Sequence, residues 1–219
     1  MTRSHTTAWL IAAATLFPLA AQAATVQVTV LGRDGKPLAD AVVVIEPITG
    51  PKPAAPTPVS ATIHQQKMQF VPGTSVLPVG SKVTFTNLDS WEHHVRATPA
   101  GLASLNAGPA SGFELRLDGK GEGREPSRSE VTLTKAGAMQ LGCHLHGSMR
   151  GFIFVADSPW TVQTDANGVA TLQGVPEGAA QVRVVHADQI LEAPPVAANI
   201  TPVTALSLPT QVQPRRRRP

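Results

Sequence analysis

Proline and glycine recur along the whole chain, and they limit the regular structure that it can form. The 219 residues include 20 Pro and 18 Gly, and Val and Thr gather in short alternating runs between them. No long apolar pattern with a 3.6-residue period is present, which disfavours long helices. Short alternating runs bounded by turn residues are typical of β-strands. We therefore expect an all-β chain with one or two domains of ordinary size.

The N-terminus has the pattern of a secretory signal peptide. Arg3 precedes an apolar stretch over residues 9–21, which closes on the small-residue pattern Ala21-Gln22-Ala23. We assign residues 1–23 to a signal peptide that is cleaved near Ala23/Ala24, which predicts a periplasmic or secreted protein. The stretch is too short for a comfortable membrane span, and no later run reaches about 18 apolar residues. We therefore expect no stable membrane insertion.

The excess positive charge lies at the C-terminus. The formal net charge is +3, and Arg215 to Arg218 follow one another in the tail over residues 209–219. Short basic runs are usually solvated, and docking onto an acidic redox partner or an anionic lipid is the functional alternative. We expect no nucleic-acid binding, because the chain has no Tyr and few aromatic residues on which bases could stack.

A similar strand-and-turn pattern occurs near both ends of the chain. Strands are expected at 26–30 and 41–45, and the turn residues 32–37 between them predict that these two strands pair. After Trp160 the pattern returns, with strands at 169–172, 181–185 and 203–208 and turns at 164–168 and 174–178. These late strands are too few for a stable sheet. We expect them to pair with the first strands across an inserted block.

The inserted block follows a proline-rich linker over residues 51–62. Its alternating runs predict strands at 83–86, 93–96, 113–117, 131–134, 139–141 and 152–155, with loops at 97–112 and 118–130. Several short strands with turns between them are typical of a β-sandwich.

One cysteine carries the chemistry of this block. Cysteines of exported proteins are normally paired, so the single Cys143 needs another explanation, such as a metal. It opens the run Cys143-His144-Leu145-His146-Gly147-Ser148-Met149, and the pair His93-His94 lies upstream. A thiolate, two imidazoles and a weak thioether form the ligand set of blue-copper centres. The sequence therefore predicts one copper ion that cycles between Cu(I) and Cu(II).

Strand parity indicates which donors point inward. Side chains alternate across a strand, so His93 shares a face with Trp91 and Val95, whereas His94 lies on the opposite, polar face. The same parity places Cys143 on the apolar side of its strand. It does not separate His144 from His146, because the chain must turn there.

Three motifs in this block carry a family resemblance. Phe85-Thr86-Asn87-Leu88-Asp89, His93-His94-Val95 and the segment over 142–155 resemble the cupredoxin (blue copper) family, in particular exported plastocyanin-like proteins of the methylamine-utilisation type. The Cys-x2-His-x2-Met spacing is similar to the amicyanin loop. The resemblance implies a Greek-key β-sandwich over residues 63–157. It also implies four ligands, namely His93, Cys143, His146 and Met149, and it leaves His94, His144 and Asn87 as neighbours of the ligands or alternative ligands.

The segments before and after this block resemble a second type of sandwich. Residues 28–46 and 164–186 are similar to a small carboxypeptidase-regulatory-like or transthyretin-like β-sandwich, which in that group flanks the copper domain. We therefore divide the mature chain into the first flanking strands (24–50), the linker, the cupredoxin domain, the rest of the flanking sandwich (158–208) and the tail.

Four protein ligands leave no open position for a substrate, unlike a catalytic metal site. We therefore expect a one-electron carrier, not an enzyme, that exchanges electrons with a redox protein of the cytochrome c or dehydrogenase type. Two alternatives stay open. One is a periplasmic copper-binding or delivery protein without a redox role, which the additional His64, His94 and His144 favour. The other is a red or green copper centre with a small catalytic role.

Overall fold

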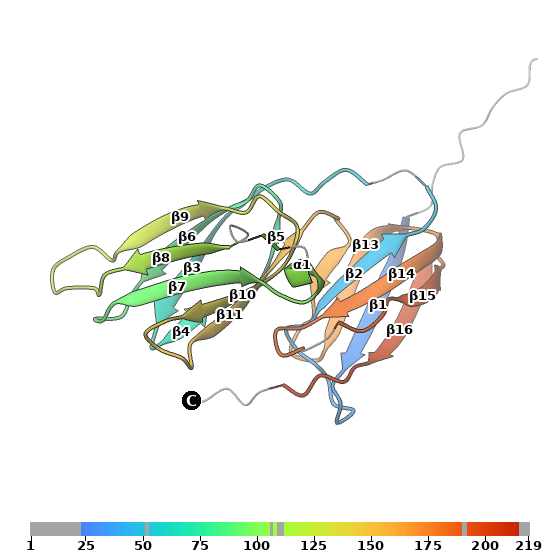
Figure 1. The fold of residues 1–219 in the computed structure, drawn as a ribbon. Helices are drawn as coiled ribbons and strands as arrows, with labels where there is room; N and C mark the ends of the chain where they lie inside the picture. The colour runs from blue at the N-terminus through green and yellow to red at the C-terminus, as the bar shows by residue number, and fades with distance from the viewer. Residues whose placement is uncertain (1–22, 51–52, 106, 109–111, 190–191, 215–219) are drawn as a thin grey trace, which may run out of the picture.

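The computed structural model describes residues 23–50, 53–105, 107–108, 112–189 and 192–214, and they form two β-sandwiches side by side (Figure 1). The predicted signal peptide lies almost wholly outside the described residues, and so do Arg215 to Arg218. Within these described ranges, no helix has the length and hydropathy that a membrane span requires.

The first unit, which we call the flanking sandwich, combines strands from both ends of the chain. One sheet has the order β13-β1-β16, and the other has the order β12-β2-β14-β15. Its strands are β1 (Ala23–Leu31), β2 (Val42–Pro47), β12 (Thr161–Gln163), β13 (Val169–Pro176), β14 (Gly178–Val185), β15 (Val196–Ile200) and β16 (Val203–Pro209). Pairing across the insertion occurs as expected, because β1 is antiparallel to β13 and β2 is antiparallel to β14.

The prediction that the first two strands pair with each other is wrong. The turn forms, with the Gly32 N–H donating to the Lys36 carbonyl at 2.8 Å, but the chain then crosses to the opposite sheet. The reason lies in β2, whose run of consecutive apolar residues must be covered on both faces. Val43 faces the core of the flanking sandwich, and Val44 faces the inserted block.

The turn expected at 174–178 is also shorter than predicted. Strand β13 continues to Pro176 with Val175 fully buried, and β14 begins at Gly178. The glycine at 174 takes a positive φ of 71°, and the pairing of β1 with β13 shifts register opposite this segment. Gly174 therefore lies in an irregularity within the strand, which is a common position for glycine in a β-ladder.

The second unit, which we call the inserted sandwich, has sheets of order β5-β11-β10-β7-β8 and β4-β3-β6-β9. Its elements are β3 (Ser60–Gln66), β4 (Gln69–Val71), β5 (Thr74–Pro78), β6 (Lys82–Asn87), β7 (His93–Pro99), α1 (Leu102–Leu105), β8 (Phe113–Leu117), β9 (Arg128–Thr132), β10 (Gly137–Cys143) and β11 (Arg150–Ala156). Its core includes Phe85, Leu117, Leu141 and Ile153, all at most 1% exposed.

Several bounds of the inserted sandwich differ from the sequence prediction. β3, β4 and β5 were not predicted, and β3 begins at Ser60, inside the range 51–62 assigned to the linker. The predicted loop over 97–112 contains the end of β7 and the helix α1. β9 begins three residues earlier and ends two residues earlier than the strand predicted at 131–134. The first three strands hold few apolar residues each, so their alternation is too weak to predict them.

The two sandwiches share an apolar contact layer. Phe152 and Phe154 of β11 pack with Val42 and Val44 of β2 and with Val185 of β14, all at most 5% exposed. The alternate residues of β11 face the core of the inserted sandwich. Strand β11 is therefore held between two hydrophobic cores.

Candidate metal centre

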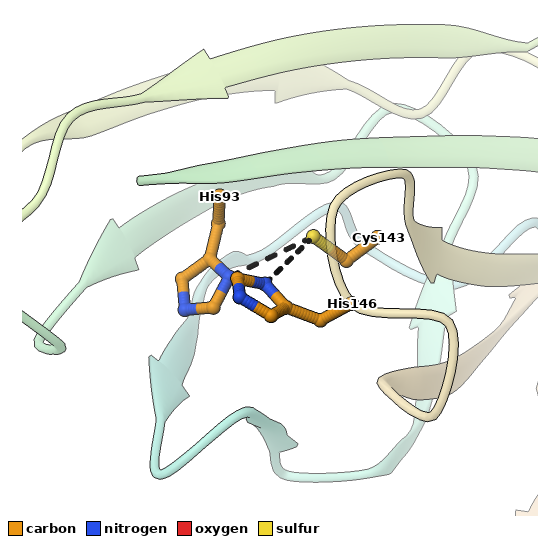
Figure 2. Close-up of side chains that lie close together, drawn as sticks. All are labelled: His93, Cys143 and His146. Atoms are coloured by element: carbon orange, nitrogen blue, oxygen red, sulfur yellow. Dashed lines mark hydrogen bonds between the residues drawn. The ribbon is translucent and has the colours of Figure 1, made fainter. Parts of the chain in front are cut away.

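Three of the predicted ligands lie together at one end of the inserted sandwich (Figure 2). His93 is the first residue of β7, Cys143 is the last residue of β10, and His146 lies in the loop that follows β10. The Sγ atom of Cys143 lies 3.6 Å from Nδ1 of His93 and 3.6 Å from Nδ1 of His146. Among the described residues, these three form the one group of His, Cys and acidic side chains close enough to hold a metal ion.

The pairing of β7 with β10 brings the first two donors together. Cys143 lies opposite Val95 in this antiparallel ladder, so the inward faces of both strands converge on the site. His93 is 0% exposed and Cys143 is 6% exposed, which confirms the parity argument for both. The parity argument also put Trp91 on the inward face, and this is wrong. β7 begins only at His93, and the Trp91 side chain is 44% exposed.

These distances fit a copper ion. For a comparable ion, bonds of about 2.3 Å to sulfur and about 2.0–2.1 Å to nitrogen put the two donors about 3.6–3.8 Å apart at angles of 110–120°. The separations between sulfur and the two nitrogens, 3.6 Å each, fall at this value. One soft thiolate with two imidazoles is a set that copper prefers. The described side chains are therefore already spaced for the metal.

Met149 is the last residue of the loop between β10 and β11, which also carries His146 and which we call the ligand loop. Its backbone N–H donates to the His146 carbonyl at 2.9 Å, which makes a tight turn between the two residues. Its side chain is 1% exposed and packs in the same buried cluster as Cys143. The thioether therefore lies in the apolar interior of the inserted sandwich, and Met149 would be the weak fourth ligand of a copper ion held by the other three residues.

Asp89 orients the buried histidine. Its Oδ2 lies 2.9 Å from Nε2 of His93, on the ring edge opposite the thiol. A carboxylate at this position assigns the ring proton to Nε2 and leaves the lone pair of Nδ1 directed at the metal site. The side chain of Asp89 is itself only 6% exposed.

A short turn between β3 and β4 holds this carboxylate. The backbone N–H of Lys67 donates to Oδ1 at 2.6 Å, and that of Met68 donates to Oδ2 at 3.0 Å. Both turn residues have positive φ values, 52° and 56°. Burial raises the pKa of the Asp89 carboxyl, but the bonds from Met68, His93 and Lys67 together outweigh it and hold this pKa below its usual value. The carboxylate is therefore the form that the fold favours.

Asn87 fixes the loop that carries Asp89 and leads to His93. Its Nδ2 donates to the carbonyls of Trp91, Leu117 and Asp118 at 2.8, 3.2 and 3.0 Å, and its Oδ1 accepts the N–H of Asp89 at 3.0 Å. The amide bonds backbone groups on both sides of the loop. Asn87 thus positions the site and contributes no donor atom to the three-residue group.

His94 and His144 lie on the outer face of the same strands. The His144 N–H donates to the His94 carbonyl at 3.1 Å, so the two residues are neighbours across the ladder. Nε2 of His94 lies 2.7 Å from a Glu92 oxygen, and Nε2 of His144 lies 3.9 Å from Glu114. Neither ring belongs to the metal group.

Asp89 is part of the motif Phe85-Thr86-Asn87-Leu88-Asp89, but the sequence alone predicted no role for it. Its spacing carried a usable signal, because Asp89 and His93 are four residues apart and an acid near a metal-binding histidine commonly accepts its ring proton. The two residues of the β3–β4 turn carried no comparable signal.

Comparisons with known proteins agree with this centre. Residues 57–156 match the family described as copper binding proteins, plastocyanin/azurin family. No curated protein sequence matches the chain.

Solved structures also resemble parts of the chain. A Cu(I) amicyanin variant is 21% identical, with a TM-score of 0.34, and the match covers 44% of this chain and 82% of that one. A second Cu(I) amicyanin variant, also 21% identical with a TM-score of 0.34, matches over 52% and 98%. A Cu-containing nitrite reductase from Thermus scotoductus SA-01 is 25% identical, with a TM-score of 0.34, over 51% of this chain and 25% of that enzyme.

The donor group and the family match lie in the same sandwich. The inserted sandwich, which residues 57–156 span in the family match, is therefore a cupredoxin domain for one copper ion.

Proposed function

We propose that the protein is an exported one-electron carrier whose copper is bound by His93, Cys143, His146 and Met149. The observation that carries the proposal is the preformed donor group, in which the thiol sulfur lies 3.6 Å from a nitrogen of each imidazole. Copper held by such a set supplies a reversible Cu(II)/Cu(I) couple. The partner in this proposal is a redox protein of the cytochrome c or dehydrogenase type.

The chain holds these donors in place before any metal is bound. His93 is fixed by Asp89, Cys143 by the β7–β10 ladder, and Met149 by its N–H bond to the His146 carbonyl. A rigid donor set accommodates both oxidation states with little rearrangement. Low rearrangement favours electron transfer, because electrostatic and geometric adjustment is a cost that a preorganised site avoids.

The surface beside His146 also supports an electron carrier. His146 is the partly exposed member of the donor group, and Leu145 next to it is 52% exposed. Met68 and Trp91, in the two loops that hold Asp89 and His93, are 43% and 44% exposed. Exposed apolar side chains around a redox centre provide contact area for a partner with few charges to desolvate.

A delivery role without redox chemistry has less support. The sequence argument for delivery was the presence of additional histidines. His94 and His144, however, face away from the donor group, and each lies near a carboxylate. A catalytic role requires an open metal position, whereas a fourth protein ligand, for which the buried Met149 is the candidate, would leave none.

The test is a titration of the mature protein with Cu(II), followed by visible absorption, electron spin resonance and voltammetry. We expect a strong thiolate-to-copper absorption and a reversible couple in the wild type. Cys143→Ser and His93→Ala should abolish the colour, whereas His94→Ala and His144→Ala, which alter neighbouring imidazoles, should keep it. A colourless protein that holds only Cu(I), or colour that survives Cys143→Ser, would contradict the proposal.

A further inference from the structure

A hollow of about 280 Å³ lies on the outer face of β7 and β10, next to the ligand loop. Cys143 and Met149 contribute to its lining, so the hollow reaches the residues of the metal centre from outside. Gly142 and Gly147 also line it, and a Cβ atom at either position would meet no other atom within 4 Å. The missing side chains keep the backbone on both sides of Cys143 accessible.

The lining is positively charged. The lining residues include Arg96 and Arg150, and none of them is acidic. Arg96 forms an ion pair of 3.3 Å with Glu114, which lies outside the lining. For Arg150, no carboxylate among the described residues lies within ion-pair distance.

The neighbouring charges on the same sheet are balanced. Arg116 of β8 donates to Glu92 at 2.8 Å, and this bond holds the pKa of the Glu92 carboxyl below its usual value. Nε2 of His94 lies against the other oxygen of Glu92. The unbalanced positive charge at the hollow is therefore that of Arg150, and Arg96 lies beside it with Glu114 as its partner.

The hollow also offers a short route to the metal. Cys143 belongs both to the donor group, through its sulfur, and to the lining of the hollow, so covalent bonds within one residue join the two. A route through bonds at Cys143 avoids any jump through space between the donor group and this surface.

We propose that this hollow receives an acidic face of the redox partner, with carboxylates beside Arg96 and Arg150. This inference rests on the proposed electron-carrier function. When the partner docks, one electron passes between its one-electron centre and the copper through Cys143, so that one centre is oxidised as the other is reduced. Charge complementarity of this kind raises the association rate and fixes the orientation of a complex.

The first test maps anion binding on the Cu(I) protein, using hexacyanochromate(III) as a redox-inert paramagnetic probe and NMR as the readout. We expect the amide signals of Gly142, His144 and Gly147 to broaden first. Arg96→Gln combined with Arg150→Gln should reduce this broadening at least fivefold. Arg116→Gln is the matched control, because it removes an ion-paired arginine from the same sheet without touching the hollow.

A second probe separates a partner surface from a small-anion site. Hexaglutamate should shift the same amide signals in the wild type, and it should fail to do so in the double variant. If hexacyanochromate(III) binds there and hexaglutamate does not, the hollow is a small-anion site and the inference is wrong. Broadening centred on Leu145 and His146, or unchanged in the double variant, would also overturn it.

Kinetics with small redox reagents tests the route and separates the two proposals. Oxidation by ferricyanide at low salt should slow about tenfold in the double variant, whereas oxidation by the cationic tris(1,10-phenanthroline)cobalt(III) should not slow. A reversible copper couple with unchanged ferricyanide rates would refute only the hollow. Absence of a reversible couple would refute the electron-carrier function, whatever binds in the hollow.

Discussion

Replacement of Asp89 by alanine tests whether the carboxylate prepares His93 for copper. In the folded protein, Oδ2 of Asp89 accepts from Nε2 of His93 at 2.9 Å, and the ring is 0% exposed. Without the carboxylate, the ring proton at Nε2 loses its acceptor in a site closed to water. The imidazole then gains by moving its proton to Nδ1 or by turning, and both changes withdraw the lone pair that faces Cys143.

The magnitude follows from the number and burial of the bonds lost. A buried donor left without an acceptor costs about 1–3 kcal/mol. The N–H groups of Lys67 and Met68 also lose their acceptor, but both residues are exposed, so water can replace the carboxylate. We therefore expect the metal-free protein to lose about 1–3 kcal/mol of its free energy of unfolding. Copper affinity should fall about 10–100-fold, as for other outer partners of metal-binding histidines.

Asparagine at the same position gives a graded comparison. Oδ2 accepts two bonds, from Met68 and His93, whereas Oδ1 accepts one, from Lys67. The single amide oxygen should therefore take the place of Oδ2 and leave the amide nitrogen against the exposed Lys67 N–H. His93 keeps an acceptor, so Asp89→Asn should lose less copper affinity than Asp89→Ala.

The assay combines urea unfolding of the metal-free protein, copper affinity by competition with a chelator, and ¹⁵N NMR of the His93 ring. The ring nitrogens should report a proton on Nε2 in the wild type and in Asp89→Asn, and a different proton distribution in Asp89→Ala. Glu125→Ala, at an acid whose side chain is 92% exposed, is the control. Copper affinity within twofold of the wild type in Asp89→Ala, with unchanged ring shifts, would refute the reasoning.

Three further substitutions test the surroundings of the site. Asn87→Ala removes bonds to three buried or half-buried carbonyls and should cost about 2–4 kcal/mol in urea unfolding; a loss below 1 kcal/mol would show that water replaces the amide. Phe154→Ala empties part of the layer between the sandwiches and should cost about 3–5 kcal/mol, with fluorescence and circular dichroism giving one common transition only in the wild type. In Gly168→Ala the new Cβ would lie 2.7 Å from a backbone oxygen at a φ of 71°, whereas Gly123 has a similar φ but open space around it. Gly168→Ala should therefore lower the melting temperature clearly more than Gly123→Ala. Equal losses in thermal unfolding would contradict the steric argument.

The sequence predicts the strands in which apolar and polar residues alternate strongly. It misses strands with few apolar residues, whose neighbouring strands supply most of the hydrophobic surface. β1 and β11 carry clear apolar patterns and were found. β3 buries only Ile63 and Gln65, and β15 buries only Ile200, so neither stands out from a polar loop. Register and partner choice were not predictable for β2, because its first four residues are all apolar and do not reveal which face meets which core.

At the candidate site, the sequence predicts the donor types and the inward direction of His93 and Cys143, since a strand fixes parity. It leaves His144 and His146 open, because parity ends with β10 at Cys143. The structure brings His146 to the thiol and places His144 outside. The support of Asp89 by the β3–β4 turn is a contact between segments about twenty residues apart, and no local pattern encodes it.

The position of β11 explains how the flanking sandwich can influence the metal centre without touching it. β11 begins at Arg150, directly after Met149, and pairs along its length with β10, the strand that ends in Cys143. Phe152 and Phe154 anchor the outer face of β11 in the layer shared with β2. The inner face of β11 packs in the core that contains Cys143 and Met149. Because both ends of the ligand loop continue into this strand pair, any loosening of the shared layer relaxes the loop from its C-terminal side. The flanking sandwich therefore contributes to the rigidity of the donor set through β11.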